Sequence, residues 1–357
     1  MQSFLKILRW SVGLLFIFSG LIKANDPLGL SYKMQEFFDV WGMSFLSDYT
    51  LGFAIFMNVL EIVTGIALII KFPYKQTLWL LLGLIVFFTF LTGYALFSGK
   101  IKTCGCFGDC IPLTPKMSFI KDIILFVSIV ILLINQQKVK TKIHKALGVF
   151  VLLISIAGVG FGQQYVLAHL PIIDCLPYKI GNDIVEKMKL PAGAVPDSIS
   201  IQMEFEKNGK SYLFDANHFP DNFDATYNFK SRKEVVVQKG NGFKAAIDDF
   251  SLNSVYTNGD TSKALFTTNS PYVLVFAGNI NSSISWDLLL SELHKKYKLV
   301  YIVTADKSNA LNQFPKENIL LGDITMIKTA ARVWPSVVVM NGSTIMQKQS
   351  YLDFLKK

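Results

Sequence analysis

Five long apolar segments in the first half of the chain restrict its fold more than any other feature. A helix that crosses a bilayer needs about 20 predominantly apolar residues. The second and third segments fit this length well, and the fourth and fifth are shorter. The five segments span residues 5–22, 51–70, 77–97, 119–134 and 146–163. The sequence therefore predicts an α-helical membrane bundle over this half of the chain.

The second half differs in composition. Charged residues make up 17% of the chain, below the roughly 25% of soluble domains, but beyond about residue 165 polar and apolar residues alternate as in a soluble protein. The 357 residues leave room for one membrane domain and one soluble domain. The net charge of +9 lies mostly in the membrane half, which has 14 basic and 7 acidic residues. The positive-inside pattern explains part of this charge, so we expect membrane lipid around the chain and no nucleic acid.

Lysine and arginine in the short loops predict the orientation. Cytoplasmic loops are enriched in these residues, and one set of loops holds eight of them against six on the opposite side. The densest cluster lies at 138–145. We therefore expect a cytoplasmic N-terminus, with residues 98–118 and everything after about 165 outside. The eight are Lys6, Arg9, Lys71, Lys75, Lys138, Lys140, Lys142 and Lys145; the six are Lys23, Lys33, Lys100, Lys102, Lys116 and Lys121.

This orientation predicts a multi-pass protein of the bacterial inner (cytoplasmic) membrane with a periplasmic C-terminal domain. A cleaved signal peptide over residues 1–24 is the alternative interpretation of the first segment. Its charged start and apolar middle fit, but no small-residue cleavage pattern precedes Lys23.

Three of the four cysteines lie within seven residues, between the third and fourth segments. They are Cys104, Cys106 and Cys110, and Cys175 follows the fifth segment. All four are expected outside, where disulfides form and persist. Four cysteines allow three full pairings, and the sequence does not choose among them. A Cys104–Cys106 bond would close a small, strained and easily reduced loop. A bond from Cys110 or Cys106 to Cys175 would instead staple the loop to the end of the fifth segment.

Structural staples, a metal site and reversible redox chemistry are the three interpretations of this cluster. Four cysteinates are soft metal ligands, but the Cys-x-x-Cys knuckle of zinc sites is absent, and the four histidines are scattered, so we expect no metal. Gly105 and Gly108 leave the sulfurs unshielded. Lys100 and Lys102 favour the reactive thiolate, whereas Asp109 opposes it. The sequence favours redox chemistry.

Glu61 lies in the middle of the second segment. A carboxylate there is costly and usually faces the interior of a helical bundle. It is either a structural hydrogen-bonding group or a proton relay that serves thiol or quinone chemistry. Arg9 and Lys23 are its candidate ion partners; Lys23 and Lys121 are otherwise expected to extend to the membrane interface.

The cysteine loop resembles that of a known family. The run from Cys104 to Gly108 is similar to the hallmark loop of MauE-type proteins, a branch of the DoxX/DoxD-like membrane family. Further likeness lies in the first two segments, at Arg9, Gly13, Ser19, Gly20, Lys23, Glu61 and Gly65. The resemblance covers about residues 5–136, and Cys110 and the soluble domain depart from it.

The resemblance implies a four-helix unit in a redox-associated membrane protein. MauE proteins are linked to the assembly of methylamine dehydrogenase, and other DoxX-family proteins to thiosulfate and quinone electron transfer. It thereby implies a quinone as the candidate cofactor, with Arg9 and Lys23 as candidate cofactor-binding residues.

The soluble half is expected to have three parts. Residues 166–198, rich in proline, indicate an extended connector with ordered junction segments. Residues 199–245 indicate a small antiparallel unit. Its strands are expected at 198–205, 211–214 and 234–238, with turns at Asn208-Gly209 and Asn241-Gly242.

Residues 246–357 show a strand and helix order that resembles the thioredoxin fold. Strands are expected at 272–277, 299–304, 336–340 and 344–347, and helices at 285–297, near 323–331 and from 351. The run from Arg332 to Ser336 resembles the cis-proline segment of that fold. Thioredoxins carry Cys-x-x-Cys where this chain has Asn279 to Ser283, and no cysteine follows Cys175. The domain therefore cannot exchange dithiols itself. It is expected to bind a partner, to present a peptide groove beside Pro335, to package the cysteine loop or to serve as a degenerate scaffold.

Two classes of function follow. The first is a membrane thiol–disulfide oxidoreductase or relay, in which the four cysteines pass electrons between outside partners and a quinone. The second is a non-enzymatic anchor or assembly factor for periplasmic proteins. A solute transporter has little support without a visible inverted repeat. The expected domains are a four-helix unit (1–136), a basic loop with the fifth span (137–165), a connector with a β-rich segment (166–245) and a thioredoxin-like domain (246–357).

Overall fold

The computed structural model describes most of the chain. The described residues are 1–101, 105–139, 143–195, 198–216, 218–220, 223–238, 240, 243–257, 259–278, 280 and 284–356. Several residues named in the sequence analysis lie outside the described residues. They are Lys102, Cys104, Lys140, Lys142, the turn at Asn241-Gly242, and Asn279 and residues 281–283, which stand where thioredoxins have Cys-x-x-Cys.

Among the described residues, five helices are long and apolar enough to cross a membrane, as the sequence predicts. They are α1 (Gln2–Asn25), α3 (Thr50–Ile70), α4 (Tyr74–Ser98), α5 (Pro115–Ile134) and α6 (Lys145–His169). The two segments expected to be short form helices of 20 and 25 residues, which is enough to span a bilayer. The chain is a multi-pass membrane protein with a β-containing C-terminal region.

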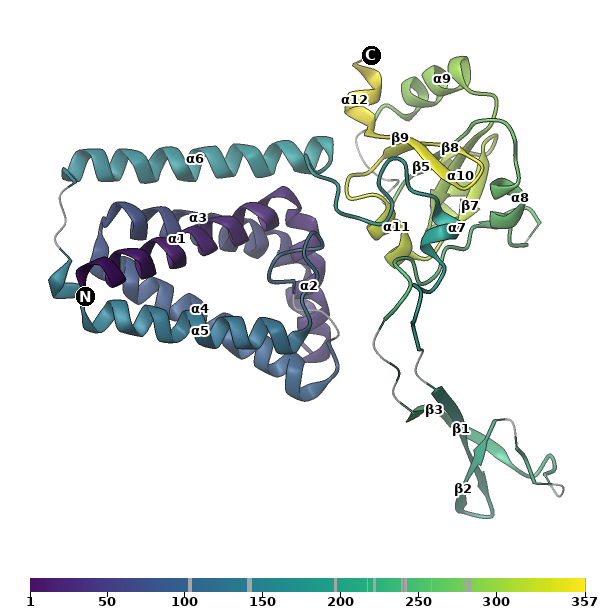
Figure 1. The fold of residues 1–357 in the computed structure, drawn as a ribbon. Coiled ribbons are helices and arrows are strands. Elements are labelled where there is room, and N and C mark those ends of the chain that lie inside the picture. The colour runs from purple at the N-terminus through teal and green to yellow at the C-terminus, as the bar shows by residue number, and fades with distance from the viewer. Residues whose placement is uncertain are drawn as a thin grey trace.

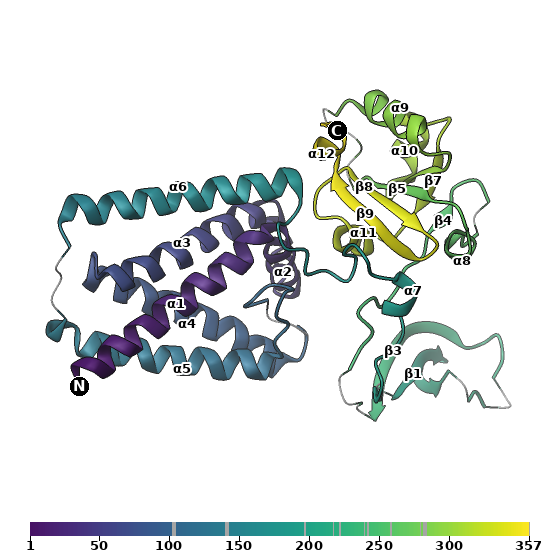
Figure 2. The same ribbon diagram turned by 45° about the horizontal axis from the view of Figure 1, so that its top comes forward.

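Helices α1, α3, α4 and α5 form a bundle, and α6 lies along its outside next to α3 (Figures 1 and 2). Glycines set the close contact between α1 and α3. A Cβ atom on Gly65 would lie 2.7 Å from the Gly13 carbonyl oxygen, and small residues allow helix backbones to approach in membranes. Helix α6 is joined to α3 by Asn58 Nδ2, which donates to Gln163 Oε1 at 2.9 Å.

A further helix, α2 (Pro27–Val40), follows α1, and a short 3-10 helix (Ser44–Tyr49) follows α2. The sequence prediction did not include them. Asp26 caps α2 by accepting from the Gly29 N–H at 2.9 Å, and Pro27 opens the helix. Helix α2 crosses the same end of the bundle that the C-terminal region adjoins (Figure 1).

The described residues of the C-terminal region form a six-stranded sheet of order β4-β7-β6-β5-β8-β9. Strands β5, β6 and β7 run parallel, and the other three pair antiparallel. The strands are β4 (Asn253–Ser254), β5 (Tyr272–Phe276), β6 (Val300–Thr304), β7 (Asn318–Leu321), β8 (Ser336–Asn341) and β9 (Thr344–Ser350). The four expected strands are present, and β4 and β7 are additional.

Helices cover both faces of this sheet. One face packs against α9 (Trp286–Lys296), α10 (Lys307–Gln313) and α12 (Tyr351–Leu355), and the other against α11 (Ile324–Ala330). A short helix, α8 (Ser262–Phe266), precedes β5. Alternate residues of each strand point to opposite faces, so Leu274 joins one apolar cluster and Val275 the other.

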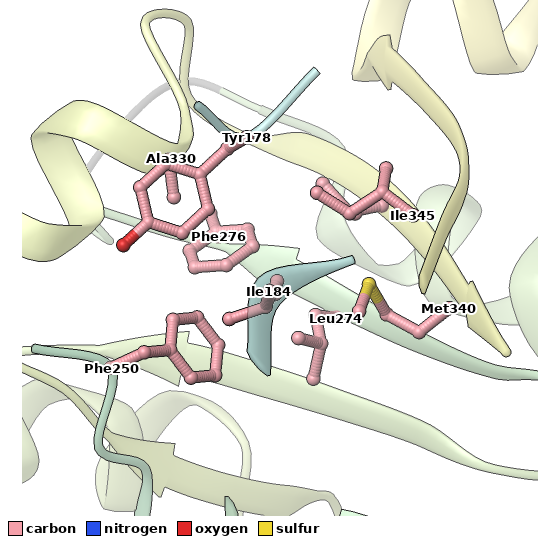
Figure 3. Close-up of a pocket in the computed structure, with 9 residues that line it drawn as sticks. Tyr178, Ile184, Phe250, Leu274, Phe276, Ala330, Met340 and Ile345 are labelled. Carbon is pink, nitrogen blue, oxygen red and sulfur yellow. The ribbon is translucent and has the colours of Figure 1, made fainter. Parts of the chain in front are cut away.

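The segment expected to be a connector contributes to this core. Figure 3 shows Tyr178 and Ile184 lying with Phe250 and Phe276 around a small apolar cavity. Tyr178 is 4% exposed and Ile184 2%. A four-residue helix, α7 (Ile184–Lys187), is capped by Asp183. Tyr178 and Ile184 are thus part of the apolar core on one face of the six-stranded sheet.

A separate three-stranded sheet projects away from the rest of the molecule (Figures 1 and 2). The described strands, in the order β2-β1-β3, are β1 (Ser198–Lys207), β2 (Lys210–Asp215) and β3 (Asn228–Gln238). Asn208 and Gly209 form the expected turn, and both have positive φ, as two-residue hairpin turns require. Aromatic rings gather around Phe205 on one face.

Candidate thiol site at the end of the bundle

A disulfide joins Cys110 to Cys175, with 4.8 Å between their Cα atoms. This is one of the pairings that the sequence left open, and it ties the loop after α4 to the segment after α6. Cys106 is half-buried in the same loop. Gly105 and Gly108 have positive φ, a conformation that favours glycine. The loop lies at the end of the bundle where α2 and the C-terminal region also lie (Figure 1).

A buried polar network lies beneath this loop. Lys23 Nζ forms an ion pair with Glu61 Oε1, and the two side chains are 4% and 1% exposed. Ser19 Oγ lies 3.0 Å from Glu61 Oε2 and 3.0 Å from the Cys106 carbonyl oxygen. The intramembrane carboxylate is therefore connected to the backbone of the cysteine loop through one hydroxyl.

The expectation that Lys23 extends to the membrane interface is wrong, because Glu61 holds its ammonium inside the bundle. Arg9, the other candidate partner of Glu61, lies about 21 Å from Lys23 along the axis of α1, towards the N-terminus of that helix. Its guanidinium donates to the Leu68 carbonyl oxygen at 3.1 Å and also to that of Ile69. Arg9 thereby satisfies carbonyls in the last turn of α3, and the structure does not bring it together with Lys23.

A second ion pair lies on α5. Lys121 Nζ is 2.8 Å from Asp122 Oδ1, and Thr92 Oγ1 donates to Asp122 Oδ2 at 3.0 Å. Lys121 Nζ also lies 5.1 Å from the centroid of the Phe107 ring. Lys121 thus faces the loop at the end of the bundle. The sequence prediction missed Asp122, although a carboxylate inside an apolar segment was the signal that identified Glu61.

A small cavity adjoins the loop. Its volume is about 40 Å³, and its lining includes Lys23, Phe88, Thr92 and Cys106. Such a volume holds on the order of three water molecules, whereas sites for drug-sized ligands measure roughly 300–1,000 Å³. The cavity therefore does not fit a quinone ring in this conformation. Among the described residues, no group of three His, Cys, Asp or Glu side chains is placed to hold a metal ion.

Two family models match parts of the chain. Residues 200–239, most of the projecting sheet, match a domain of unknown function (DUF8463). No curated protein and no solved structure gives a match. Residues 1–135, which span α1 to α5 and the cysteine loop, match the family model of methylamine utilisation protein MauE. The membrane bundle of this chain is therefore similar to MauE.

Proposed function

We propose that this chain is an integral membrane thiol–disulfide redox protein whose reactive group is the Cys110–Cys175 disulfide with its neighbouring thiols. The observation that supports this most is the chain of contacts from Lys23 and Glu61 through Ser19 to the Cys106 backbone. It connects a buried carboxylate to a loop with three cysteines. The proposal places the loop and the C-terminal region on the periplasmic side of the bacterial inner membrane, where disulfides persist.

The proposed reaction is thiol–disulfide exchange with a periplasmic dithiol protein. A thiolate of that partner attacks one sulfur of the Cys110–Cys175 bond and forms a mixed disulfide. The second partner thiolate then displaces this chain, so the partner leaves oxidised and Cys110 and Cys175 become thiols. Two electrons and two protons have moved to this chain. Cys106 and Cys104 are further candidates for exchange within the loop. The two electrons then pass to an acceptor disulfide, which is reduced to a dithiol, and no step is assigned to a quinone.

Glu61 is the proposed proton-holding group of this site. Formation of a disulfide from two thiols releases two protons, and a carboxylate connected to the loop can accept one of them. Lys23 holds that carboxylate in place, and the adjoining cavity has room for water between Lys23 and Cys106. The Lys121 ammonium lies 5.1 Å from the Phe107 ring and so brings a cation to the cysteine loop.

We further propose a DoxX-like bundle and a thioredoxin-like C-terminal domain. The support for the second is the mixed sheet with helices on both faces. Since no cysteine follows Cys175, this domain acts by binding and not by exchange.

Alkylation trapping in intact membranes tests the redox function. Cysteines are blocked rapidly, reduced and labelled with a second reagent, and mass spectrometry then gives the oxidised fraction at each position. We expect Cys110 and Cys175 to become reduced with a dithiol substrate and to reoxidise when glutathione disulfide is added as the two-electron acceptor, and Glu61→Gln to slow the reoxidation. Glu36→Gln, a change at a half-exposed ion pair with Lys33, is the matched control. Cysteines that keep one state under every condition would contradict the proposal.

A second candidate function is a non-enzymatic anchor or assembly factor for periplasmic proteins, as in a maturation role in methylamine utilisation. The match of residues 1–135 to the MauE model favours it. Crosslinking followed by purification distinguishes the two. A client captured equally well by the wild type and by the Cys110→Ser/Cys175→Ser variant supports assembly, and capture that needs the cysteines supports exchange.

A further inference from the structure

Both halves of the disulfide are held in the same way by the C-terminal domain. Asp109 precedes Cys110, and its Oδ2 lies 2.6 Å from Arg332 Nη2. Asp174 precedes Cys175, and its Oδ2 lies 2.8 Å from Lys348 Nζ. Each cysteine therefore follows an aspartate that is paired with a cation from the six-stranded sheet or its adjoining loop.

Arg332 is built into this junction. Its side chain is 6% exposed, and each guanidinium nitrogen has a partner. Besides the bond to Asp109, Nε donates to Asp26 Oδ2 at 2.8 Å and Nη1 donates to the Lys328 carbonyl oxygen at 2.8 Å. Burial acts to lower the pKa of Arg332, but the two carboxylates outweigh it and raise the pKa. A buried guanidinium needs these partners. Movement of the domain away from the bundle would therefore separate Arg332 from the carboxylates of Asp26 and Asp109.

Lys348 holds the other half. Its side chain is 3% exposed, and Nζ also donates to the Tyr178 carbonyl oxygen at 3.2 Å. The segment before Cys175 is fixed from the membrane side as well. Asn25 Nδ2 donates to the Ile173 carbonyl oxygen at 2.8 Å, and the Ile173 N–H donates to Asn25 Oδ1 at 3.0 Å. The backbone around Cys175 is thus fastened to both α1 and β9.

We propose that the C-terminal domain is a clamp on the Cys110–Cys175 disulfide, with Arg332 and Lys348 as its positioning residues. The two cysteines are 65 residues apart in sequence, and the ion pairs hold the residue before each of them against one rigid sheet. This placement favours the closed disulfide. Because equilibrium coupling is reciprocal, opening the disulfide must weaken docking of the domain by the same factor.

The direction of the effect follows from the charges. A cation beside a sulfur stabilises the thiolate and so favours reduction, but Asp26, Asp109 and Asp174 neutralise the cations here. The main effect of Arg332 and Lys348 is then to hold the residues before Cys110 and Cys175 in place, which favours the disulfide. Removal of either cation therefore makes the disulfide easier to reduce. The clamp deepens the redox function proposed above, on which its physiological use rests. The disulfide equilibrium itself can be measured whether or not the loop cycles in cells.

The test uses the full-length protein in detergent at equilibrium with glutathione. The measured reaction converts two protein thiols and one glutathione disulfide into the protein disulfide and two glutathione thiols. We expect Arg332→Gln and Lys348→Gln each to lower the equilibrium constant for the protein disulfide about tenfold, which is about 30 mV. Arg332→Lys keeps the positive charge, so its equilibrium constant should lie between those of the wild type and of Arg332→Gln.

Two matched controls change ion-paired side chains far from the loop. Arg232→Gln alters a half-exposed pair with Glu234 in the projecting sheet, and Lys295→Gln alters a surface pair with Glu292 on α9. Neither should change the equilibrium constant. Should the buried substitutions prevent folding, Asp109→Asn tests the same contact from its more exposed side, since the Asp109 side chain is 43% exposed.

The reciprocal arm measures docking. In the Cys110→Ser/Cys175→Ser variant, amide hydrogen exchange at residues 324–330 and 171–178 should accelerate at least tenfold, because docking of the domain is weakened. An equilibrium constant that stays unchanged, or rises, when the Arg332 contact is lost would overturn the clamp. The two proposals fail separately: a glutathione equilibrium that shifts with Arg332, in a chain whose cysteines never cycle in membranes, keeps the clamp and removes the relay.

Discussion

The Glu61 carboxylate is one of the deeply buried charged groups of the bundle. It is 1% exposed, and an unpaired charge at such a position destabilises a protein far more than a paired one. Its two oxygens have two partners, Lys23 and Ser19. At the scale of single residues, the stability of the bundle and the chemistry of the loop therefore depend on the same group.

Replacement of Lys23 by methionine should strand the Glu61 charge. We expect Lys23→Met to destabilise the bundle by about 3–5 kcal/mol, and the double variant Lys23→Met/Glu61→Leu to recover most of this loss. Denaturant unfolding of the purified protein in detergent measures both. Lys33→Met is the control, because its pair with Glu36 is partly exposed and such pairs contribute about 0–1 kcal/mol. Equal losses for Lys23→Met and Lys33→Met would contradict this account.

Asp183 gives a pH-dependent contribution in the C-terminal region. Burial acts to raise its pKa, but hydrogen bonds from Ser343 and from the backbone of α7 outweigh it and lower the pKa below the ordinary 3.8. A carboxyl group with a lowered folded pKa adds stability above its unfolded pKa and loses it as the pH falls through the folded value. We expect Asp183→Asn to lower the free energy of unfolding at pH 7, and the difference should vanish in acid when unfolding is followed by tryptophan fluorescence. A loss that is independent of pH would show that the charge is not involved.

At the scale of elements, the helices that span the membrane were predictable and several smaller elements were not. A run of about 20 apolar residues permits few structures, so α1 and α3 to α6 follow from sequence. Strand β7 is only four residues long, too short for a periodic signal. Helix α2 begins at Asp26-Pro27, which indicates a turn as readily as a helix start.

The candidate site was predictable in its residue types and, as alternatives, in the pairings of Lys23 with Glu61 and of Cys110 with Cys175, but not in its other contacts. Cysteine spacing and the intramembrane carboxylate identified the loop and Glu61. The bridge through Ser19 depends on the rotation of α1 against α3, which packing sets and local sequence does not. The pairings of Asp109 with Arg332 and of Asp174 with Lys348 join residues 223 and 174 positions apart, and no local pattern reports such a contact.

The contact between α1 and α3 gives a prediction at the same scale. Gly65→Ala adds only a methyl group, but its Cβ would lie 2.7 Å from the Gly13 carbonyl oxygen, so the helices must separate. Overpacking of this kind typically costs about 1–3 kcal/mol. Gly83→Ala on α4 is the matched control, because no atom lies within 4 Å of its added Cβ. Thermal unfolding in detergent compares the two, and similar midpoints would argue against a close helix contact.

At the scale of the whole molecule, the bundle and the C-terminal region are joined at one end of the membrane domain (Figure 1). The described contacts between them are mostly polar: Arg332 with Asp26 and Asp109, Lys348 with Asp174, and His169 Nδ1 with Asp353 Oδ1 at 2.7 Å. Polar interfaces within a chain permit relative motion unless something else restrains them. The Cys110–Cys175 bond ties the segment that leads from α6 into the C-terminal region back to the bundle, so it supplies that restraint.

Without the disulfide, the bundle and the C-terminal region should therefore unfold independently of each other. A bond between residues 65 positions apart stabilises the folded chain by about 4 kcal/mol in the loop-entropy model. We expect the Cys110→Ser/Cys175→Ser variant to lose stability of this order and to unfold in two transitions, with the C-terminal region first.

Pulse proteolysis across a urea series resolves the two regions by fragment size. Reductant should produce the same change in the wild type and none in the variant. A variant that still unfolds in one transition at the wild-type midpoint would show that the ion pairs alone couple the two halves.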